Sequence, residues 1–271
     1  MVLQDKRLAV AIPDTVLEER DTLREKTVKL GTIARACAIY GVDVIEVFRD
    51  TAGRGEGKLV KKILEYLETP QYLRRRLYSL DESLKFAGLL PPLRIPSHKP
   101  RVPFDSVRVG DVREGVVNDD GTVDVGLERA ARLKPRLEPN SRVTVRIVSK
   151  DPFTAETVGR EAVGQYWGYR VESRSLEEVL GDGRFELKIA TSRYGNAIRS
   201  VVQRLREEVK KAGSIMLIFG SPTRGLYEIV GPGLPRRVDF VVNLFVEQHV
   251  ETVRTEEAIF AGLNLVNNLL L

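Results

Sequence analysis

Prolines between residues 91 and 103 separate two kinds of sequence in this 271-residue chain. Five prolines fall in this stretch, and proline can neither donate a backbone hydrogen bond nor continue a helix, so the stretch must be an extended connection. Before it, and again after Pro152, apolar strands alternate with amphipathic helices, whereas only short β-rich runs lie between. The pattern therefore predicts an α/β domain that a second domain interrupts. We expect residues 1–90 and 160–271 in the first domain and residues 91–159 in the second.

The N-terminal part begins with a strand, a helix and another strand. Arg7–Ile12 is apolar and ends at Pro13, while Asp21–Tyr40 has apolar residues at helical spacing and is followed by Gly41, which can end a helix. Val42–Phe48 is rich in β-branched residues. Strands joined by such a crossover are parallel neighbours, so the sequence predicts a Rossmann-like parallel sheet.

The same alternation continues elsewhere in the chain, and we expect one sheet to include strands from both sides of the insertion. The further elements that the pattern predicts are strands at Tyr166–Val171, Phe185–Thr191, Ile215–Phe219 and Val238–Leu244, and helices at Glu56–Leu67, Gln71–Tyr78, Ser175–Leu180, Asn196–Ala212 and Thr255–Leu271.

The inserted segment resembles a small β-barrel in its composition. Short β-rich runs occur at Asp111–Val117, Thr122–Leu127 and Arg142–Ser149, and the first two are joined by the turn 118–121, which ends in Asp-Gly. From Leu93 to Lys150 there are 12 Lys and Arg against 8 Asp and Glu, compared with 31 against 30 elsewhere, so nearly all the excess positive charge lies here. An OB-like barrel that binds RNA fits this pattern. A β-rich excursion that only packs on its host is the alternative.

Several classes of protein are excluded by composition. Cys37 is the only cysteine, so no internal disulfide can form, and two histidines, His98 and His249, provide no cluster for a metal site. No apolar run approaches the roughly 20 residues that cross a bilayer, so we expect no membrane association. We expect a soluble, unprocessed, cytoplasmic protein.

A glycine-rich stretch, Ala52–Lys58, lies between a strand and a helix, where a phosphate loop would stand. A P-loop would need glycine at Ala52 and a hydroxyl residue at Leu59, and a dinucleotide fingerprint from Gly53 would need glycine at Lys58. The stretch is therefore interpreted as a flexible or RNA-contacting loop.

Two basic clusters occupy neighbouring predicted helices. Such clusters are either solvated surface or contacts for RNA phosphates. Their members are Lys58, Lys61 and Lys62 in the first, and Arg74, Arg75 and Arg76 in the second.

The C-terminal region carries the most specific pattern. The strand Ile215–Phe219 leads into a loop with Gly220 and Gly225, the strand Val238–Val242 leads into a polar loop, and Thr255 can cap the last helix. Because ends of successive parallel strands meet at one edge of a sheet, these loops can line one crevice for a small molecule. Ordinary loops around a capped helix are the alternative.

The sequences of these loops resemble the SPOUT superfamily of trefoil-knotted methyltransferases, and within it the branch of archaeal and eukaryotic putative RNA methyltransferases. The resemblance is carried by Phe219–Leu226, Asn243–Gln248 and Thr252–Ile259, with support from Tyr166–Tyr169 and Val10–Pro13. It covers essentially the whole chain, and the inserted domain corresponds to an OB-like domain of that branch. Pro222 and Thr223 depart from it, because glycine-rich sequence is common there in the superfamily.

The resemblance implies a homodimer with a C-terminal trefoil knot, and S-adenosylmethionine as the methyl donor. A sulfonium is already an activated donor, so alignment supplies most of the rate and a general base is optional. By position, Arg254 is the candidate for polarising the acceptor and Glu256 for removing a proton. The implied cofactor-binding residues are Thr191, Ser192, Phe219, Gly220, Ser221, Gly225, Leu226, Asn243, Gln248, Val253, Thr255 and Ala258.

Three functions remain compatible with the sequence. The first is an S-adenosylmethionine-dependent RNA methyltransferase, with ribosomal RNA as the expected acceptor and RNA held by the barrel and the basic clusters. The second uses the same cofactor to methylate protein arginine. The third is a non-catalytic RNA-binding or assembly protein that keeps the fold.

Overall fold

The computed structural model describes residues 6–51 and 54–270, so Ala52 and Gly53 of the glycine-rich stretch and the terminal Leu271 lie outside the described residues. Two compact units are distinguished. The α/β unit comprises Met1–Leu67, Glu82–Leu93 and Tyr169–Leu271, and the barrel unit comprises Glu68–Asp81 and Arg94–Gly168. The second unit thus includes a segment before the prolines that the sequence assigned to the first.

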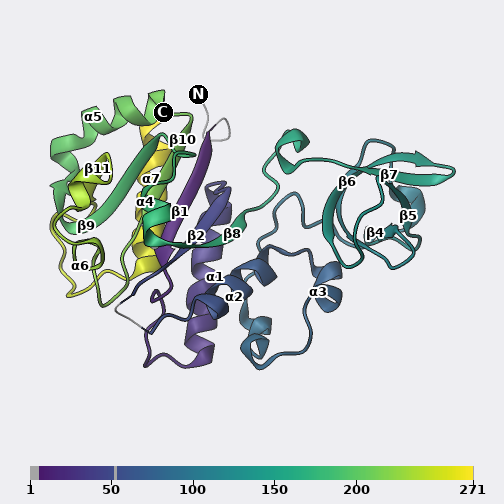
Figure 1. The fold of residues 1–271 in the computed structure, drawn as a ribbon, viewed down its shortest axis with the longest axis horizontal. Helices are drawn as coiled ribbons and strands as arrows, with labels where there is room; N and C mark the ends of the chain where they lie inside the picture. Colours follow the sequence, from purple (N-terminus) through teal and green to yellow (C-terminus); the bar gives the residue numbers. More distant parts are fainter. Residues whose placement is uncertain (1–5, 52–53, 271) are drawn as a thin grey trace. The chain divides into compact units, whose positions relative to one another are not determined.

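The α/β unit is built on a six-stranded sheet in which every neighbouring pair is parallel (Figure 1). The strand order is β11-β9-β10-β1-β2-β8, so the strands on the two sides of the insertion do share one sheet. Their bounds are β1 (Arg7–Pro13), β2 (Val44–Arg49), β8 (Arg170–Ser175), β9 (Leu187–Ala197), β10 (Ser214–Ile218) and β11 (Phe240–Asn243).

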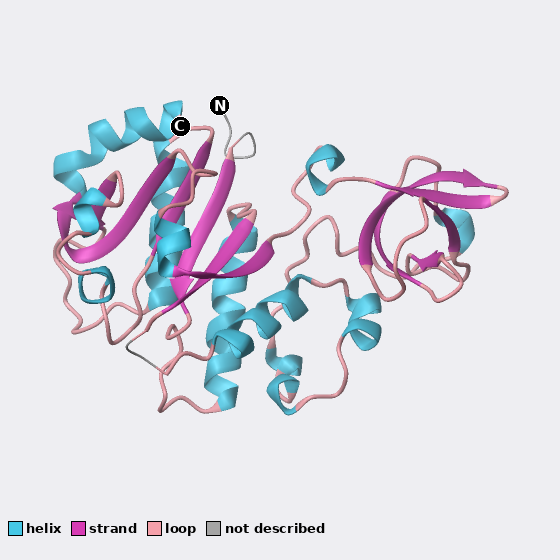
Figure 2. Cartoon of the chain, viewed as in Figure 1, coloured by secondary structure: helices cyan, strands magenta, loops and turns pink. Residues whose placement is uncertain are grey.

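Helices alternate with these strands along the chain (Figure 2). The first helix begins with a capping box at Thr22 and Glu25, and it is followed by Gly41 at φ 70°, as the sequence predicted. The helices are α1 (Leu23–Ile39), α2 (Gly57–Glu68), α4 (Leu176–Leu180), α5 (Ile198–Lys211), α6 (Leu226–Val230) and α7 (Thr255–Leu269), with short 3₁₀ turns at Glu82–Leu84, Ala87–Leu89 and Leu234–Arg236.

Both faces of the sheet are buried, as in other parallel sheets. On one face, Ala11 of β1 and Ile218 of β10 pack with Leu180 and Leu226 in one apolar cluster. Residues of β1 that point to the other face, such as Val10, are also fully buried. The helices α1 and α7 lie side by side, where the Tyr40 hydroxyl approaches the Asn264 side-chain oxygen at 3.3 Å.

The barrel unit contains a closed five-stranded barrel of order β3-β4-β5-β7-β6. Strands β5 and β7 pair in parallel, and the other pairs are antiparallel. Its interior is filled by small apolar side chains, among them Val117, Val123, Val145 and Ile147. The elements are β3 (Val112–Val117), β4 (Thr122–Asp124), β5 (Ala131–Lys134), β6 (Arg142–Lys150) and β7 (Phe153–Thr157), with α3 (Gln71–Leu77) and 3₁₀ turns at Phe104–Ser106 and Arg160–Val163.

A buried ion network joins Glu68, the first residue of the segment 68–81, to the barrel within this unit. Arg142 donates to Glu114 at 2.6 Å and to Glu68 at 2.6 Å, and the Trp167 indole donates to Glu114 at 2.7 Å. Burial alone would raise the pKa of Glu114, but Arg142 and Arg160 hold it below its ordinary value. This network explains why the segment Glu68–Asp81 belongs with the barrel.

Several sequence-based boundaries were wrong. The strand expected at Tyr166–Val171 begins only at Arg170, because Gly168 has a φ of 102° and the side chains of Trp167 and Tyr169 are anchored inward by hydrogen bonds. The strands β5 and β7 and the helix α6 were not predicted, and Thr122–Leu127 is a strand only as far as Asp124. None of the described helices has the length and apolar character needed to cross a membrane.

Candidate functional site

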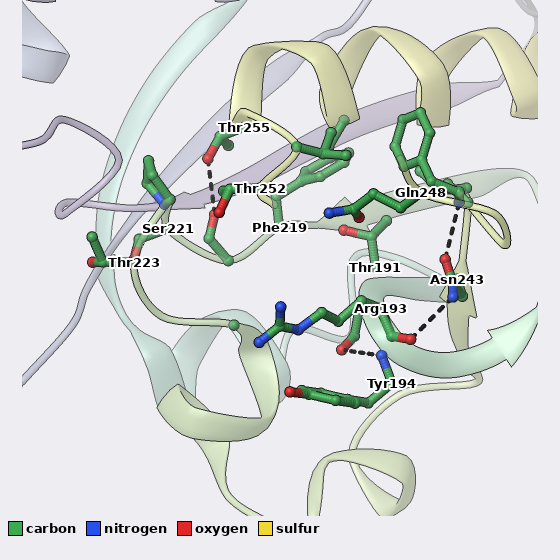
Figure 3. A pocket seen from close by; sticks show the side chains of 18 of the residues that line it. Thr191, Arg193, Tyr194, Phe219, Ser221, Thr223, Asn243, Gln248, Thr252 and Thr255 are labelled. Carbon is green, nitrogen blue, oxygen red and sulfur yellow. Dashed lines mark hydrogen bonds between the residues drawn. The ribbon is translucent and has the colours of Figure 1, made fainter. Parts of the chain in front are cut away.

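A pocket of about 290 Å³ opens where residues 191–194 of β9 and the loops that follow β10 and β11 meet the start of α7 (Figure 3). These segments lie toward the carboxyl ends of parallel strands in one sheet, which is where ligands bind in open α/β sheets. The lining residues are Thr191, Ser192, Arg193, Tyr194, Phe219, Gly220, Ser221, Pro222, Thr223, Gly225, Glu228, Asn243, Leu244, Phe245, Gln248, Glu251, Thr252, Val253, Thr255 and Ala258.

The loop after β10 is a tight turn that comes close to its own backbone. The Ser221 amide donates to the Arg224 carbonyl at 2.9 Å, and the Arg224 amide donates to the Ser221 hydroxyl at 2.9 Å. A methyl group on Gly220 would lie 2.8 Å from the Arg224 carbonyl oxygen, so only glycine fits at this position without displacement. Pro222 and Thr223 form the tip of this closed turn and line the pocket.

The Arg224 side chain holds this loop to the end of β2. Its guanidinium pairs with Asp50, which is buried, and also donates to the Glu228 carbonyl at 3.0 Å. The Asp50 amide in turn donates to the Asp14 carboxylate at 2.9 Å, and burial raises the pKa of Asp14. The positive charge of Arg224 is therefore used to fix the loop.

The second loop is held by amide side chains. Asn243 accepts from the Phe245 amide at 2.9 Å and donates to the Arg193 carbonyl at 3.0 Å, so it joins the ends of β11 and β9. Gln248 donates to the carbonyls of Val250 at 2.7 Å and Glu251 at 3.0 Å. Both side chains therefore form hydrogen bonds with backbone groups around the pocket.

The third segment is the start of α7. The Thr255 hydroxyl donates to the Gly220 carbonyl at 3.3 Å, and the side chain of Thr255 is buried. The Glu257 carboxylate accepts from the Arg254 amide at 2.9 Å, which satisfies one of the free amides at the start of the helix.

The structure brings eleven of the twelve sequence-derived cofactor residues into the pocket lining, and Leu226 is the exception. Leu226 is fully buried in the core cluster beneath the loop, where α6 packs on the sheet.

Neither proposed catalytic residue lines the pocket. Arg254 is exposed, and its guanidinium makes no ion pair with any residue in the described ranges. Glu256 points to α1, where its carboxylate lies 3.8 Å from the Lys29 ammonium. This orientation follows from helical geometry, because residues 255 and 256 project about 100° apart around the helix axis.

Nine lining residues were not among the cofactor residues that the sequence indicated: Arg193, Tyr194, Pro222, Thr223, Glu228, Leu244, Phe245, Glu251 and Thr252. A signal for Arg193 and Tyr194 was present, since they come soon after an apolar strand. Glu228 belongs to α6, which was not predicted.

The two basic clusters lie in different units. Lys58, Lys61 and Lys62 are on α2, whereas Arg74, Arg75 and Arg76 are on α3 in the barrel unit. Within the barrel unit, Arg74 donates to the Thr69 carbonyl at 2.8 Å and Arg76 donates to the Val117 carbonyl at 3.1 Å. Arg74 and Arg76 therefore also have structural roles. No group of residues suited to hold a metal ion occurs in the described part of the chain.

Comparison with known proteins relates the whole chain to one family. Residues 7–266 match the model of a family described as "Putative RNA methyltransferase". An uncharacterised protein of Haloarcula marismortui is 34% identical over 94% of this chain and 96% of its own. The 28S rRNA (uridine-N(3))-methyltransferase of Mus musculus is 33% identical over 94% of this chain and 74% of its own.

A solved SpoU methyltransferase from Streptomyces viridochromogenes, in complex with AdoMet, is 10% identical with a TM-score of 0.40, over 98% of this chain and 58% of that chain. This chain thus spans less than two thirds of that protein. The family match and the archaeal and animal relatives agree with the branch indicated by the loop sequences. The chain belongs to the family of putative RNA methyltransferases.

Proposed function

We propose that this protein is an S-adenosylmethionine-dependent methyltransferase that acts on RNA, with ribosomal RNA as the acceptor. The observation that carries the proposal is the pocket formed by residues 191–194 of β9, the loops after β10 and β11 and the start of α7, in a chain that belongs to this family. The mouse relative, named as a 28S rRNA (uridine-N(3))-methyltransferase, supports a uridine in ribosomal RNA as the acceptor.

The pocket fits a cofactor that has both apolar and polar parts. Its volume of about 290 Å³ is at the lower end of ligand sites. Phe219, Leu244 and Ala258 provide apolar walls, while Thr252 and the loop backbones provide hydrogen-bonding groups. Because Gly220 has no side chain, its backbone passes close to the Arg224 carbonyl and the loop keeps its tight turn. When bound, S-adenosylmethionine would supply an activated methyl group.

The chain's own contribution is to orient the acceptor, exclude water and receive a proton. Glu228 and Glu251 are the acidic residues in the pocket lining. Glu228 is engaged by the Gly225 amide at 3.1 Å, whereas the Glu251 carboxylate has no partner among the residues that the structure describes. Glu251 is therefore better placed to accept a proton than Glu256, which faces Lys29.

The barrel unit supplies a basic surface for RNA in this proposal. On β5 the side chains alternate, with Ala131 and Leu133 buried and Arg132 and Lys134 exposed. Neither Arg132 nor Lys134 forms an ion pair within the described ranges. The strand order, with one parallel pair closing the barrel, supports an OB-like domain, and in that fold the second and third strands bear the nucleic-acid face.

A homodimer and a trefoil knot remain parts of the proposal, as does a cytoplasmic location. The dimer is supported by exposed apolar side chains on the adjacent helices α1 and α7: Val28 is 48%, Ile39 52% and Phe260 44% exposed. Side chains of this kind on neighbouring helices are typical of a surface that a partner covers.

Calorimetric titration with S-adenosylmethionine and its demethylated product tests the pocket, and we expect saturable binding of both. No binding at millimolar ligand would overturn the proposal. Labelled cofactor offered with ribosomal RNA and, separately, with ribosomal protein then identifies the acceptor. Label in RNA supports the proposal, label in protein supports arginine methylation, and cofactor binding without transfer to either supports the non-catalytic role.

A further inference from the structure

The strand β9 contains a five-residue bulge at the pocket. Ala190 of β9 pairs with Val241 of β11, yet the next residue of β11, Val242, pairs with Asn196. Residues 191–195 therefore have no partners on β11 and interrupt the pairing of the two strands; we call them the 191–195 bulge. An ordinary bulge contains one extra residue, and bulges are frequent next to active sites.

The 191–195 bulge is held in place by specific contacts. A methyl group on Gly195 would lie 2.7 Å from the Val241 carbonyl oxygen, so the chain can return to the sheet here only at a glycine. Asn243 donates to the Arg193 carbonyl at 3.0 Å, and the Ser192 hydroxyl accepts from the Tyr194 amide at 3.2 Å. The bulge is thus a built element of the site.

What the bulge presents is an aromatic ring and a positive charge at the pocket (Figure 3). The Tyr194 residue is 64% exposed, so its ring is accessible to a ligand. The Arg193 guanidinium carbon lies 4.9 Å from the centre of the Tyr194 ring. Apart from this contact, neither side chain has an ion pair or ring contact in the described part of the chain.

We propose that the 191–195 bulge is the acceptor-nucleotide site: Tyr194 stacks on the unpaired base to be methylated, and Arg193 binds the adjoining phosphate. The inference rests on the proposed function and names the residues that receive the RNA. Proteins that recognise single-stranded RNA stack its bases on aromatic rings or guanidinium planes. The exposed ring adjoins the pocket, whereas Phe219, the aromatic wall proposed for the cofactor, is 1% exposed.

Photocrosslinking tests the site without requiring turnover. The full chain is mixed with an oligouridylate containing 4-thiouridine, in the presence of the demethylated cofactor product, and irradiated; crosslinked peptides are then mapped by mass spectrometry. We expect a crosslink to the peptide containing Tyr194, lost in Tyr194→Ala. Crosslinks confined to other peptides would overturn the inference, whether or not the protein transfers methyl groups.

Kinetics on large-subunit ribosomal RNA transcripts provide the second test. We expect Tyr194→Ala to lower kcat/KM for RNA by about ten- to a hundredfold, with Tyr194→Phe recovering most of the loss because it keeps the stacking surface. Arg193→Gln should weaken RNA binding and flatten its dependence on salt. The matched control is Arg206→Gln, which removes the same charge from an exposed position on α5 and should change kcat/KM less than about twofold.

The affinity for the demethylated cofactor product separates the two proposals. Unchanged affinity in Tyr194→Ala, together with lost RNA turnover, supports the acceptor site. If Tyr194→Ala lowers the cofactor affinity as much as it lowers RNA turnover, the ring holds the cofactor. That result would overturn this inference but not the proposed function. A wild-type protein that binds no cofactor would overturn the proposed function, while the crosslink would still decide the role of Tyr194.

Discussion

The hydroxyl of Thr255 donates a hydrogen bond to the backbone carbonyl of Gly220, with 3.3 Å between the oxygen atoms. This bond joins the start of the last helix to the loop after β10, two adjacent segments that both line the pocket. Thr255 is only 4% exposed, so water competes poorly for the bond.

Replacing Thr255 with valine keeps the shape of the side chain and removes the donor. We expect a free energy of unfolding lower by about 1 kcal/mol and a Kd for the demethylated cofactor product raised about three- to tenfold. Thr255→Ser keeps the hydroxyl and serves as the control. Calorimetric Kd values that are equal in the valine and serine variants would contradict this role for the bond.

Gly220→Ala should disrupt the same loop from within. The added methyl group would lie 2.8 Å from the Arg224 carbonyl oxygen and 3.1 Å from the Leu226 nitrogen, and neither backbone atom can move freely. We expect a Kd for the cofactor product at least about tenfold higher, and a destabilisation of about 1–3 kcal/mol by overpacking. Gly233→Ala is a suitable control, because a methyl group there meets nothing within 4 Å. Cofactor affinity that is the same in both variants would show that the loop tolerates the change.

The pH dependence of stability should contain a contribution from Glu46. This residue of β2 is fully buried, its Oε1 atom lies 2.7 Å from Arg184 and 3.7 Å from Arg174, and its Oε2 atom has no partner among the described residues. Burial raises the pKa of Glu46 to about 7, with Glu172 adding to the effect and the two arginines opposing it.

Because the folded-state pKa of Glu46 exceeds the ordinary value of 4.5, the folded chain holds more protons than the unfolded chain between these values. Its contribution to the free energy of unfolding therefore falls as pH rises from about 5 to 8, by on the order of 2 kcal/mol. Urea titrations of wild type and Glu46→Gln across this range isolate the effect, since other groups contribute equally to both. A difference between them that stays constant with pH would refute the assignment.

Neutralising β5 of the barrel should weaken RNA binding without affecting the pocket. In Arg132→Gln/Lys134→Gln we expect weaker RNA binding and a salt slope smaller by about 1 to 2, because two phosphate contacts are lost. The double variant Arg206→Gln/Lys210→Gln removes the same charges from exposed positions on α5. The measurement is RNA affinity at several salt concentrations. If this affinity depends on salt with the same slope in the two double variants, β5 is excluded as the RNA-binding face.

The parallel sheet was predictable because its strands are continuous apolar runs, which strands buried on both faces require. The short strands of the barrel were harder to predict from the sequence. In β5 the exposed Arg132 and Lys134 interrupt the apolar residues, so a four-residue strand has the composition of a loop. Tyr166–Tyr169 misled in the opposite way, since its aromatic residues are typical of a strand but are fixed by side-chain hydrogen bonds to Glu114 and Leu64.

The pocket could be located from glycines and strand ends, but its details could not. The 191–195 bulge depends on the register between β9 and β11, which are separated by more than 40 residues in the sequence. No local pattern specifies such a register. The loops that carry the family resemblance line the pocket, yet the resemblance could not show that Glu256 turns toward Lys29 or that Glu251 belongs to the pocket lining.

The chain leaves the sheet after β2 and returns at β8, which pairs with β2 at the edge. The roughly 120 residues between them thus start and finish on adjacent strands. An excursion anchored in this way can lengthen, shorten or be exchanged with little strain on the strands that carry the pocket, because the cost of closing a loop grows only slowly with its length. If the inserted unit binds RNA as proposed, evolution could therefore change the RNA that is recognised while the strands that carry the pocket stay as they are.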